Sequence, residues 1–327
     1  MADEFERICR LMEQLPPCGE DVRVGVGDDA AILQLPIDND VVVSTDTMVE
    51  GVHFRQDTLS WADVGYKCVA ASVSDIAAMG ATPTSVLLSL ALPASLSMDE
   101  MLNIYQGVAD ACHEYGVSVI GGDLVQSSQS MLTSTVLGKI DKKQALLRSG
   151  AKPGDVLFVT GHLGASAAGL KLLLTSYGMR DALDAAYVIS RHRRPTARVL
   201  AGQTFLRYGV NSCNDISDGL ASELNEIAKA SQVRLRVEIE KIPLHHATRN
   251  VARQLGESAL DYALSGGEDY ELVATAPPVV YARLLPLLEA VRLPITAIGR
   301  VESGDGVVGE WPDGKLDVIL ATGYHHF

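Results

Sequence analysis

The chain has 327 residues, of which 47% are hydrophobic and 21% charged, so it has enough apolar side chains for two folded domains and is not disordered. Its formal net charge of −14 argues against a nucleic-acid partner, because such proteins neutralise phosphates with basic residues. An anionic substrate would need divalent cations beside it, because like charges about 4 Å apart repel by about 4 kcal/mol at an effective dielectric constant of about 20.

Cysteine usage and the N-terminal segment predict a reduced, cytoplasmic location. The five cysteines are odd in number and none lies in a Cys-x-x-Cys spacing, which argues against a disulfide framework and a zinc site. Residues 1–7 are acidic and lack the apolar run of a signal peptide. The apolar stretch 86–92 is far shorter than the ~20 residues that span a bilayer, so we expect no membrane contact.

The first half of the chain alternates helical and strand-like patterns. We expect residues 41–44 to form a strand buried on both faces, because its valines are unbroken. Gly80 is a typical stop for the helix before it. The expected helices are 5–15, 61–79 and 99–115, and the expected strands are 22–26, 41–44, 85–92, 118–120 and 131–140.

A turn-rich segment at 149–155 marks the boundary between two domains, 1–148 and 149–327. The second domain continues the mixture of helices and strands, so the sequence predicts a two-domain α/β (α+β) fold with a C-terminal α/β domain. In this half the expected helices are 165–174 and 219–230, and the expected strands are 156–160, 235–239, 271–276 and 295–299.

Residues 25–30 read Gly-Val-Gly-Asp-Asp-Ala and match the form of a dinucleotide-binding turn. That interpretation fails because Pro36 follows too soon for the required helix, and because two carboxylates would lie where the pyrophosphate binds. Adjacent aspartates after a glycine turn suit a hard cation, whose preferred ligands are oxygens. A solvated loop is an equally good interpretation of this segment alone.

Three further acidic segments follow in the first half. Residues 44–46, Ser-Thr-Asp, come after the predicted buried strand, where α/β proteins place their sites, although a helix N-cap fits as well. Asp75 lies near the end of a predicted helix, where the helix dipole disfavours an anion. Residues 121–123, Gly-Gly-Asp, follow a short strand; the glycines allow the backbone to approach a phosphate, and a tight turn is the alternative.

The second half adds two segments of the same kind. Asp215 and Ser217 would face the same way in an extended segment, with Asp218 leading into a helix. Residues 265–271, Ser-Gly-Gly-Glu-Asp-Tyr-Glu, repeat the order of glycine and acid, with a Gly-Gly hairpin as the alternative. The sequence has no P-loop, Gly-x-Ser-x-Gly or His-Glu-x-x-His motif. Together the segments predict a metal-rich polyphosphate site on turns, between the two domains.

These segments, in this order, resemble those of the thiamine-monophosphate kinase family, within the superfamily that includes aminoimidazole-ribonucleotide synthetase. Residues 44–46 with His53, and the block 265–271, are the parts most specific to the kinase. The matching segments span nearly the whole chain: 27–31, 44–46, 51–54, 73–81, 121–123, 148–151, 215–220, 265–271 and 323–324.

The resemblance implies ATP-dependent phosphorylation of thiamine monophosphate to thiamine diphosphate by direct in-line transfer of the γ-phosphate, with several magnesium ions. It also implies a homodimer in which the N-terminal sheets pair into a β-barrel. The implied magnesium ligands are Asp29, Ser44, Thr45, Asp46, Asp75, Asp123, Asp215 and Asp218. The implied ATP contacts are Tyr105, Gly122, Asp123, Arg148 and Ser217, the substrate contacts are His53, Glu268 and Tyr324, and the catalytic residues are Asp46, Asp123 and Arg148.

Other functions stay open at this point. Selenophosphate synthetase would need a reactive cysteine near the N-terminus, and Cys9 and Cys18 lack a glycine-rich loop around them. A hydrogenase-maturation protein of the superfamily would need a C-terminal cysteine where this sequence has Phe327. A regulatory protein that binds nucleotide without catalysis is the alternative from another class.

Overall fold

The computed structural model describes residues 13–17, 19, 22–24, 32–33, 38–175 and 181–323. The chain divides into two compact units, one formed by Met1–Ile76 and Ala81–Lys143 and the other by Ala77–Gly80 and Gln144–Phe327. Arg148 belongs to the second unit, and the domain bounds 1–148 and 149–327 stay a prediction. No helix among the described residues is long and apolar enough to cross a membrane.

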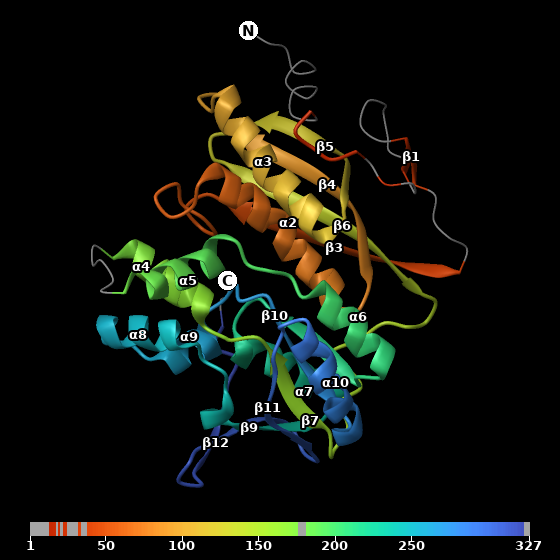
Figure 1. Ribbon diagram of the computed structural model, residues 1–327, viewed down its shortest axis with the longest axis vertical. Helices are drawn as coiled ribbons and strands as arrows, with labels where there is room; N and C mark the ends of the chain where they lie inside the picture. The colour runs from red at the N-terminus through yellow and green to blue at the C-terminus, as the bar shows by residue number, and fades with distance from the viewer. Residues whose placement is uncertain are drawn as a thin grey trace. The chain divides into compact units, whose positions relative to one another are not determined.

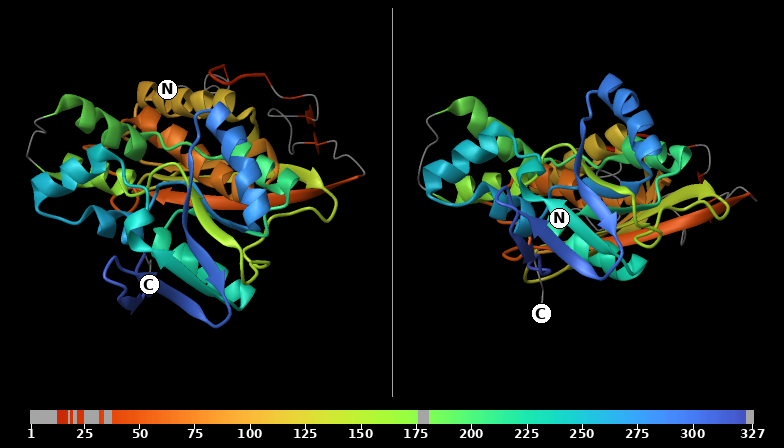
Figure 2. Two further views of the ribbon diagram at one scale, coloured as in Figure 1. Left: turned by 60° about the horizontal axis from the view of Figure 1, so that its bottom comes forward. Right: turned by 90° about the horizontal axis from the view of Figure 1, so that it is seen from below.

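The first unit is a four-stranded sheet in the order β3-β6-β4-β5. β4 and β5 are parallel, because α3 connects them, and the other neighbours are antiparallel. Helices α2 and α3 lie on the same side of this sheet (Figures 1 and 2). The bounds are β1 (Val22–Val24), β2 (Ile32–Leu33), β3 (Asn39–Val49), α2 (Trp61–Ala78), β4 (Thr82–Leu92), α3 (Met98–Tyr115), β5 (Ser118–Gln126) and β6 (Met131–Asp141).

Two glycines allow α2 and α3 to pack backbone against backbone. A Cβ on Gly65 would lie 2.0 Å from the carbonyl oxygen of Ile104, and one on Gly107 would lie 1.8 Å from that of Ala62. Any side chain at these positions would force the helices apart. The glycines therefore fix how closely α3 covers α2.

The sheet of the first unit corrects the prediction of a strand buried on both faces. Along β3, residues alternate between a face beneath the helices and an open face, where Val41 is 39% and Val43 is 58% exposed. The exposed Val125 and Met131 belong to β5 and β6. An unbroken run of valines showed a strand but could not show that only one face is covered within this unit.

Strand ends also differ from the prediction. β3 continues past residue 44 to Val49, and β5 continues past residue 120 to Gln126. Asp46 and Asp123 therefore lie within strands, so the prediction of a site on turns is wrong for these two. Asp75 lies within α2 and the buried Asp215 within β8 (Ser212–Ile216), as expected from the predicted helix and the extended segment, and neither is on a turn.

The second unit is built on a seven-stranded sheet in the order β13-β12-β9-β11-β7-β10-β8, in which only β12 and β9 are a parallel pair. The remaining strands are β7 (Val156–Thr160), β9 (Arg234–Glu238), β10 (Glu271–Ala276), β11 (Ile295–Glu302), β12 (Gly306–Glu310) and β13 (Leu316–Val318). The helices are α4 (Ala165–Leu174), α5 (Ala182–Arg193), α6 (Val199–Tyr208), α7 (Leu220–Ser231), α8 (His246–Leu255), α9 (Ala259–Ser265) and α10 (Pro278–Ala290), with a short 3-10 turn at Ile239–Lys241.

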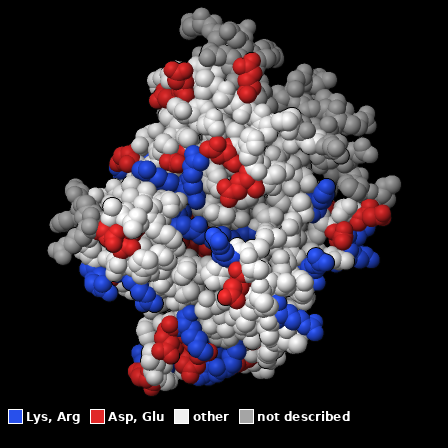
Figure 3. Space-filling view, in the orientation of Figure 1, with Lys and Arg blue, Asp and Glu red and all other residues white. Residues whose placement is uncertain are grey.

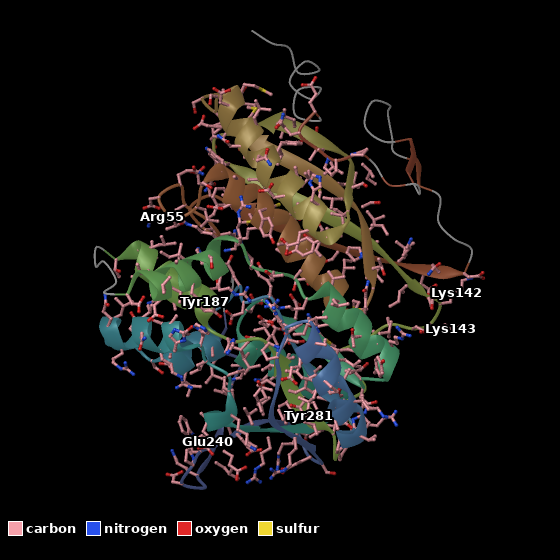
Figure 4. All side chains as sticks on the ribbon, viewed as in Figure 1. Arg55, Lys142, Lys143, Tyr187, Glu240 and Tyr281 are labelled. Atoms are coloured by element: carbon pink, nitrogen blue, oxygen red, sulfur yellow. The ribbon has the colours of Figure 1, made fainter. Side chains whose placement is uncertain are left out.

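Two apolar layers cover the two faces of this sheet. Leu157 and Val159 of β7 pack in the same cluster as the apolar residues of α7, whereas Phe158 packs with Phe205 of α6 and with α10. On α10, the Tyr281 hydroxyl accepts a hydrogen bond from the Ala297 amide at 3.0 Å, which ties the helix to β11 (Figure 4). α7 and the α6–α10 pair therefore lie on opposite faces of the sheet.

Acidic and basic side chains lie side by side over the strands at the bottom of Figure 3. Arg236 of β9 pairs with Glu310 of β12 at 2.8 Å and with Glu302 of β11 at 3.6 Å. Such surface pairs contribute little stability, at about 0–1 kcal/mol each. These ion pairs therefore add little to the stability of the second unit.

Candidate functional site

In the first unit, β3 and α2 bring three of the predicted metal ligands onto one side of the sheet. The Ser44 hydroxyl donates a hydrogen bond to a carboxylate oxygen of Asp75 in α2. Asp46 is two residues further along β3 and so shares the face of Ser44. Burial raises the pKa of the Cys68 thiol in α2 to about 12, and the nearby charge of Asp46 adds to this effect.

Thr45 lies on the opposite face. Its hydroxyl is 2.9 Å from that of Thr135 on β6, and the next pair on this face, Thr47 and Thr133, is also 2.9 Å apart. Strand alternation therefore separates the Thr45 hydroxyl from the side chains of Ser44 and Asp46.

Asp123 is not brought together with Asp46. Asp46 pairs with Ser134, then Leu88 and Gly122 follow in the same row across the sheet, so Gly122 lies three strand spacings from Asp46, or about 14 Å. Asp123 follows in the next row, which contains Ser89 and the open-face residues Thr47 and Thr133. Asp46 and Asp123 therefore lie in different rows of the sheet, and their side chains are on opposite faces.

The packing of the sheet requires a glycine at position 122. A Cβ at this position would lie 1.8 Å from the carbonyl oxygen of Leu88, so β5 can approach β4 here only with a glycine.

The remaining predicted residues of this unit lie apart from Gly122 in the sequence. His53 accepts a hydrogen bond at Nδ1 from the Val49 amide at 3.0 Å, which places the proton of the neutral ring on Nε2. Burial raises the pKa of Tyr105 in α3 to about 12. Asp29 lies outside the described residues.

In the second unit, three segments far apart in the sequence meet. The Glu268 amide donates to the Ser217 carbonyl at 2.6 Å, and the Tyr270 amide donates to the Ile216 carbonyl at 2.9 Å. The Gly323 amide donates to the Ser222 hydroxyl at 3.1 Å. Segments 215–219, 265–271 and 322–323 therefore form one cluster. The predicted substrate residue Tyr324 lies outside the described residues.

The backbone of this cluster is tightly constrained. Gly219 has φ +105°, and a Cβ on it would lie 2.7 Å from the Leu264 carbonyl oxygen. A Cβ on Gly323 would lie 2.3 Å from the carbonyl oxygen of Asp218. Glu268 and Tyr270 adopt left-handed conformations, with φ +65° and +50°, which non-glycine residues seldom do. Such strain is typical of functional sites, where the surrounding structure enforces it.

The three acids of segment 265–271 have different surroundings. Glu268 has a carboxylate oxygen 3.5 Å from Nδ1 of the buried His192. Asp269 accepts hydrogen bonds from the amides of Gly164 and Ser166, at 2.6 and 3.3 Å, and so caps the N-terminus of α4. Burial raises the pKa of its carboxyl to about 7. Asp269 is therefore a structural residue.

Glu271 is fully buried in an ionic network. Its carboxylate accepts from Arg198, from Arg191 at 3.0 Å and from the Thr160 hydroxyl at 2.6 Å. Burial alone would raise the pKa of this carboxyl, but the two guanidinium groups and the hydroxyl hold it below its ordinary value. Of the three acids, Glu268 is the one suited to contact a ligand.

Arg148 and the segment 214–218 are joined by buried polar side chains. Arg148 Nε donates to Asn214 Oδ1 at 3.1 Å, and the Asn214 amide nitrogen donates to Glu223 in α7. The other Glu223 oxygen accepts from the Asp218 amide at 3.3 Å. Two predicted site residues, Arg148 and Asp218, are thus linked through two residues that the sequence analysis did not select.

Comparison with known proteins identifies the family. Residues 27–140 match the family described as AIR synthase related protein, N-terminal domain, and residues 152–312 match its C-terminal domain. A thiamine-monophosphate kinase of Bacillus subtilis (strain 168) is 41% identical over 309 residues, covering 94% of each chain. One of Escherichia coli (strain K12) is 40% identical and covers 99% of this chain and 98% of that one. The chain belongs to the thiamine-monophosphate kinase family.

Solved structures of the family share the fold. The crystal structure of thiamine-monophosphate kinase from Stenotrophomonas maltophilia K279a has a TM-score of 0.85 at 35% identity, covering 95% of this chain and 97% of that one. AaThiL complexed with AMPPCP and TMP has a TM-score of 0.80 at 34% identity, covering 99% and 97%. Hydrogenase maturation protein HypE, at 22% identity and a TM-score of 0.77, is similar in fold alone. The predicted mixed α/β fold with two units is confirmed.

In this member of the thiamine-monophosphate kinase family, the predicted magnesium ligands are dispersed. Among the described residues, no three histidine, cysteine, aspartate or glutamate side chains are grouped so that they could hold a metal ion. The predicted ligands supply oxygen atoms from carboxylates and hydroxyls, which are the donors that Mg²⁺ prefers. The chemistry of the donor set fits magnesium.

Residues that the sequence analysis missed surround the predicted ones: Asn214, Glu223, Arg191, His192 and Arg198. One signal was readable. Glu223 lies three residues after Leu220 and four before Ile227, on the apolar stripe of a predicted helix, where an acid is unexpected. The contacts of Arg191 and Arg198 join α5 and α6 to β10 and depend on the tertiary fold, so sequence spacing gave no signal for them.

Proposed function

We propose that this chain is a thiamine-monophosphate kinase, which transfers the γ-phosphate of ATP onto the phosphate of thiamine monophosphate and forms thiamine diphosphate. The observation that carries the proposal is the identity of about 40% over nearly the whole chain to kinases of this name. A structural neighbour with the same fold is complexed with AMPPCP, an ATP analogue, and TMP.

Several magnesium ions would be held by the aspartates of both units, with Ser44, Asp46 and Asp75 as one group, Asp123 as another, and Asp215 and Asp218 as a third. Bound magnesium would neutralise charge on the phosphates. A phosphate monoester is ionised near pH 7, so the acceptor needs no general base. The residues of this chain then act by positioning and by electrostatic stabilisation.

The remaining roles follow the family resemblance and stay proposals. Asp46, Asp123 and Arg148 are the proposed catalytic residues, and Asp29 and Thr45 complete the proposed magnesium ligands. The proposed contacts to ATP are Tyr105, Gly122, Asp123, Arg148 and Ser217, and those to thiamine monophosphate are His53, Glu268 and Tyr324. A carboxylate and an aromatic ring suit the cationic thiazolium of this substrate.

We also propose a cytoplasmic homodimer in which the N-terminal sheets of two copies pair into a β-barrel. The open face of the four-stranded sheet supports this, because the described residues Val41, Val43, Val125 and Met131 are 39–58% exposed there. Val43→Asp should convert the dimer to a monomer, as measured by light scattering after size-exclusion chromatography. A wild-type monomer at micromolar concentration would contradict the dimer.

The test of function is incubation with ATP, magnesium chloride and thiamine monophosphate, followed by chromatography for thiamine diphosphate. Free thiamine is run in parallel as acceptor. Product from thiamine monophosphate alone is expected, and product from free thiamine alone would overturn the substrate assignment. Tight Mg-ATP binding without ADP formation would favour the regulatory alternative.

A further inference from the structure

A continuous chain of hydrogen bonds runs from Arg148 to the Asp218 turn through two buried side chains. Arg148 Nε donates to Asn214 Oδ1 at 3.1 Å, and Asn214 Nδ2 donates to Glu223 Oε2. The Asp218 amide donates to Glu223 Oε1 at 3.3 Å. Asn214 is 3% and Glu223 is 4% exposed, so water does not substitute for either link.

The direction of every bond in this chain is fixed. The Arg148 guanidinium can only donate, so the amide oxygen of Asn214 must face it and the amide nitrogen must face Glu223. The Asp218 backbone amide also can only donate, so both Glu223 oxygens act as acceptors. Asn214 and Glu223 are thereby each held at both ends of the side chain.

Packing does not explain why an acid stands here. Glu223 projects from the stripe of α7 that carries Leu220, Leu224 and Ile227, all fully buried. Burial raises the pKa of the Glu223 carboxyl to about 7, and a hydrophobic residue at such a position is often neutral or stabilising compared with a buried ionisable group. The benefit of Glu223 is therefore in the geometry that it imposes on its hydrogen-bond partners.

We propose that Asn214 and Glu223 are positioning residues that hold the Arg148 guanidinium and the 215–218 segment in one arrangement around the nucleotide phosphates. This inference rests on the proposed function, in which Arg148, Asp215, Ser217 and Asp218 contact ATP or its magnesium. Asn214 and Glu223 touch neither substrate; they act through these residues.

The test exchanges donor and acceptor in the hydrogen bond between Asn214 and Glu223. Glu223→Gln places its amide nitrogen opposite one of two donors, either the Asn214 amide nitrogen or the Asp218 backbone amide. Asn214→Asp places a carboxylate opposite that of Glu223. The double variant N214D/E223Q restores a donor facing an acceptor at every link and keeps the net charge of the wild type. Glu238→Gln is the control, because it makes the same change at the end of β9, where the Glu238 carboxylate pairs with Lys241 of the 3-10 turn at 2.7 Å.

Two readouts are measured on each full-length variant: steady-state kinetics with ATP and thiamine monophosphate, and calorimetric binding of Mg-AMPPCP. Each single variant should lose about tenfold or more in kcat/KM for ATP and in Mg-AMPPCP affinity, as loss of residues that orient ligands typically does. KM for thiamine monophosphate should stay unchanged. The double variant should return to within about threefold of the wild type, because the two changes are coupled through one bond.

The outcomes separate the inference from the proposed function. Single variants with wild-type KM for ATP and wild-type Mg-AMPPCP affinity would overturn the positioning role, as would a double variant no better than the worse single one. A loss that follows melting temperature alone, with both KM values unchanged, would show a structural role and also overturn it. If the wild type makes no thiamine diphosphate, the proposed function falls and the Mg-AMPPCP arm still decides the inference. If the wild type does not bind Mg-AMPPCP either, both fall.

Discussion

The acids of the first unit and those of the second are positioned by different means. Ser44, Asp46 and Asp75 lie within a strand and a helix, so sheet register and helix packing set their places. Segments 215–219 and 265–271 meet through backbone hydrogen bonds, close glycine contacts and left-handed residues. We therefore expect that Asp46 can be replaced without disturbing the fold, whereas the second cluster should depend on its backbone.

Asp46→Asn tests the first half of this comparison and should have the largest effect. The amide is a poorer ligand for magnesium, so kcat should fall by about a thousandfold, equivalent to about 4 kcal/mol. The circular dichroism spectrum and melting temperature should match those of the wild type. Asp141→Asn, an exposed acid at the end of β6, is the control and should retain full activity. Near-wild-type turnover at saturating magnesium would exclude Asp46 as a ligand.

Arg198→Met tests whether the second region depends on its buried ion pairs. The variant leaves the fully buried Glu271 with Arg191 and Thr160 as its side-chain partners among the described residues, and should cost about 3 kcal/mol of unfolding free energy in urea titrations. Arg55→Met removes an exposed pair with Asp57 in the first unit (Arg55 is labelled in Figure 4) and should cost less than about 1 kcal/mol. Equal losses in the two variants would contradict the comparison.

The ion pair between Arg198 and Glu271 also predicts how stability depends on pH. Glu271 has a pKa below its ordinary value of 4.5, so its ionised form stabilises the fold above that pH, and this stabilisation is lost as the pH falls through the lowered pKa. In Arg198→Met, unfolding free energy should therefore fall less between pH 5 and acid pH than in the wild type. A steeper fall in the variant would contradict the assignment.

Gly219→Ala tests the backbone of the second cluster. A Cβ here would meet the Leu264 carbonyl oxygen at 2.7 Å in a conformation with φ +105°, so the variant should lose about 2 kcal/mol or more. Gly256→Ala is the matched control, because φ is +70° but nothing lies within 4 Å of the added Cβ, and only about 1 kcal/mol is expected. Similar denaturation midpoints for the two variants would show that close packing at Gly219 does not matter.

The type of function was easier to predict from the sequence than the placement of the acidic residues in the fold. Glycine-acid segments pointed to the 215–219 and 265–271 cluster because turn chemistry is local. The strand through residues 121–123 was missed because its pairing with β4 is a long-range contact that overrides the local preference of two glycines. Residues 176–190 and 244–260 carry no recognisable motif, and no helix was expected at α5 or α8. Most of the stability of such helices comes from tertiary packing, which the local sequence does not show.

The smallest expected effect is in the alkylation of two cysteines, one in each unit. Cys68 in α2 lies near Asp46, and Cys213 in β8 precedes Asn214; both are buried. Burial raises the pKa of the Cys68 thiol to about 12 and also raises that of Cys213, so neither should react with iodoacetamide at pH 8 in the native protein. Peptide mass spectrometry measures each site separately.

Combining this alkylation with Gly219→Ala separates local from global loosening. If the second cluster is held by its backbone contacts, the variant should open β8 and α7 locally, and labelling of Cys213 should rise severalfold while Cys68 stays protected. Gly256→Ala should leave both sites protected. Equal rises in the labelling of Cys68 and Cys213 would mean that the two units open together. The different ways in which the two groups of acids are positioned would then make no difference to local stability.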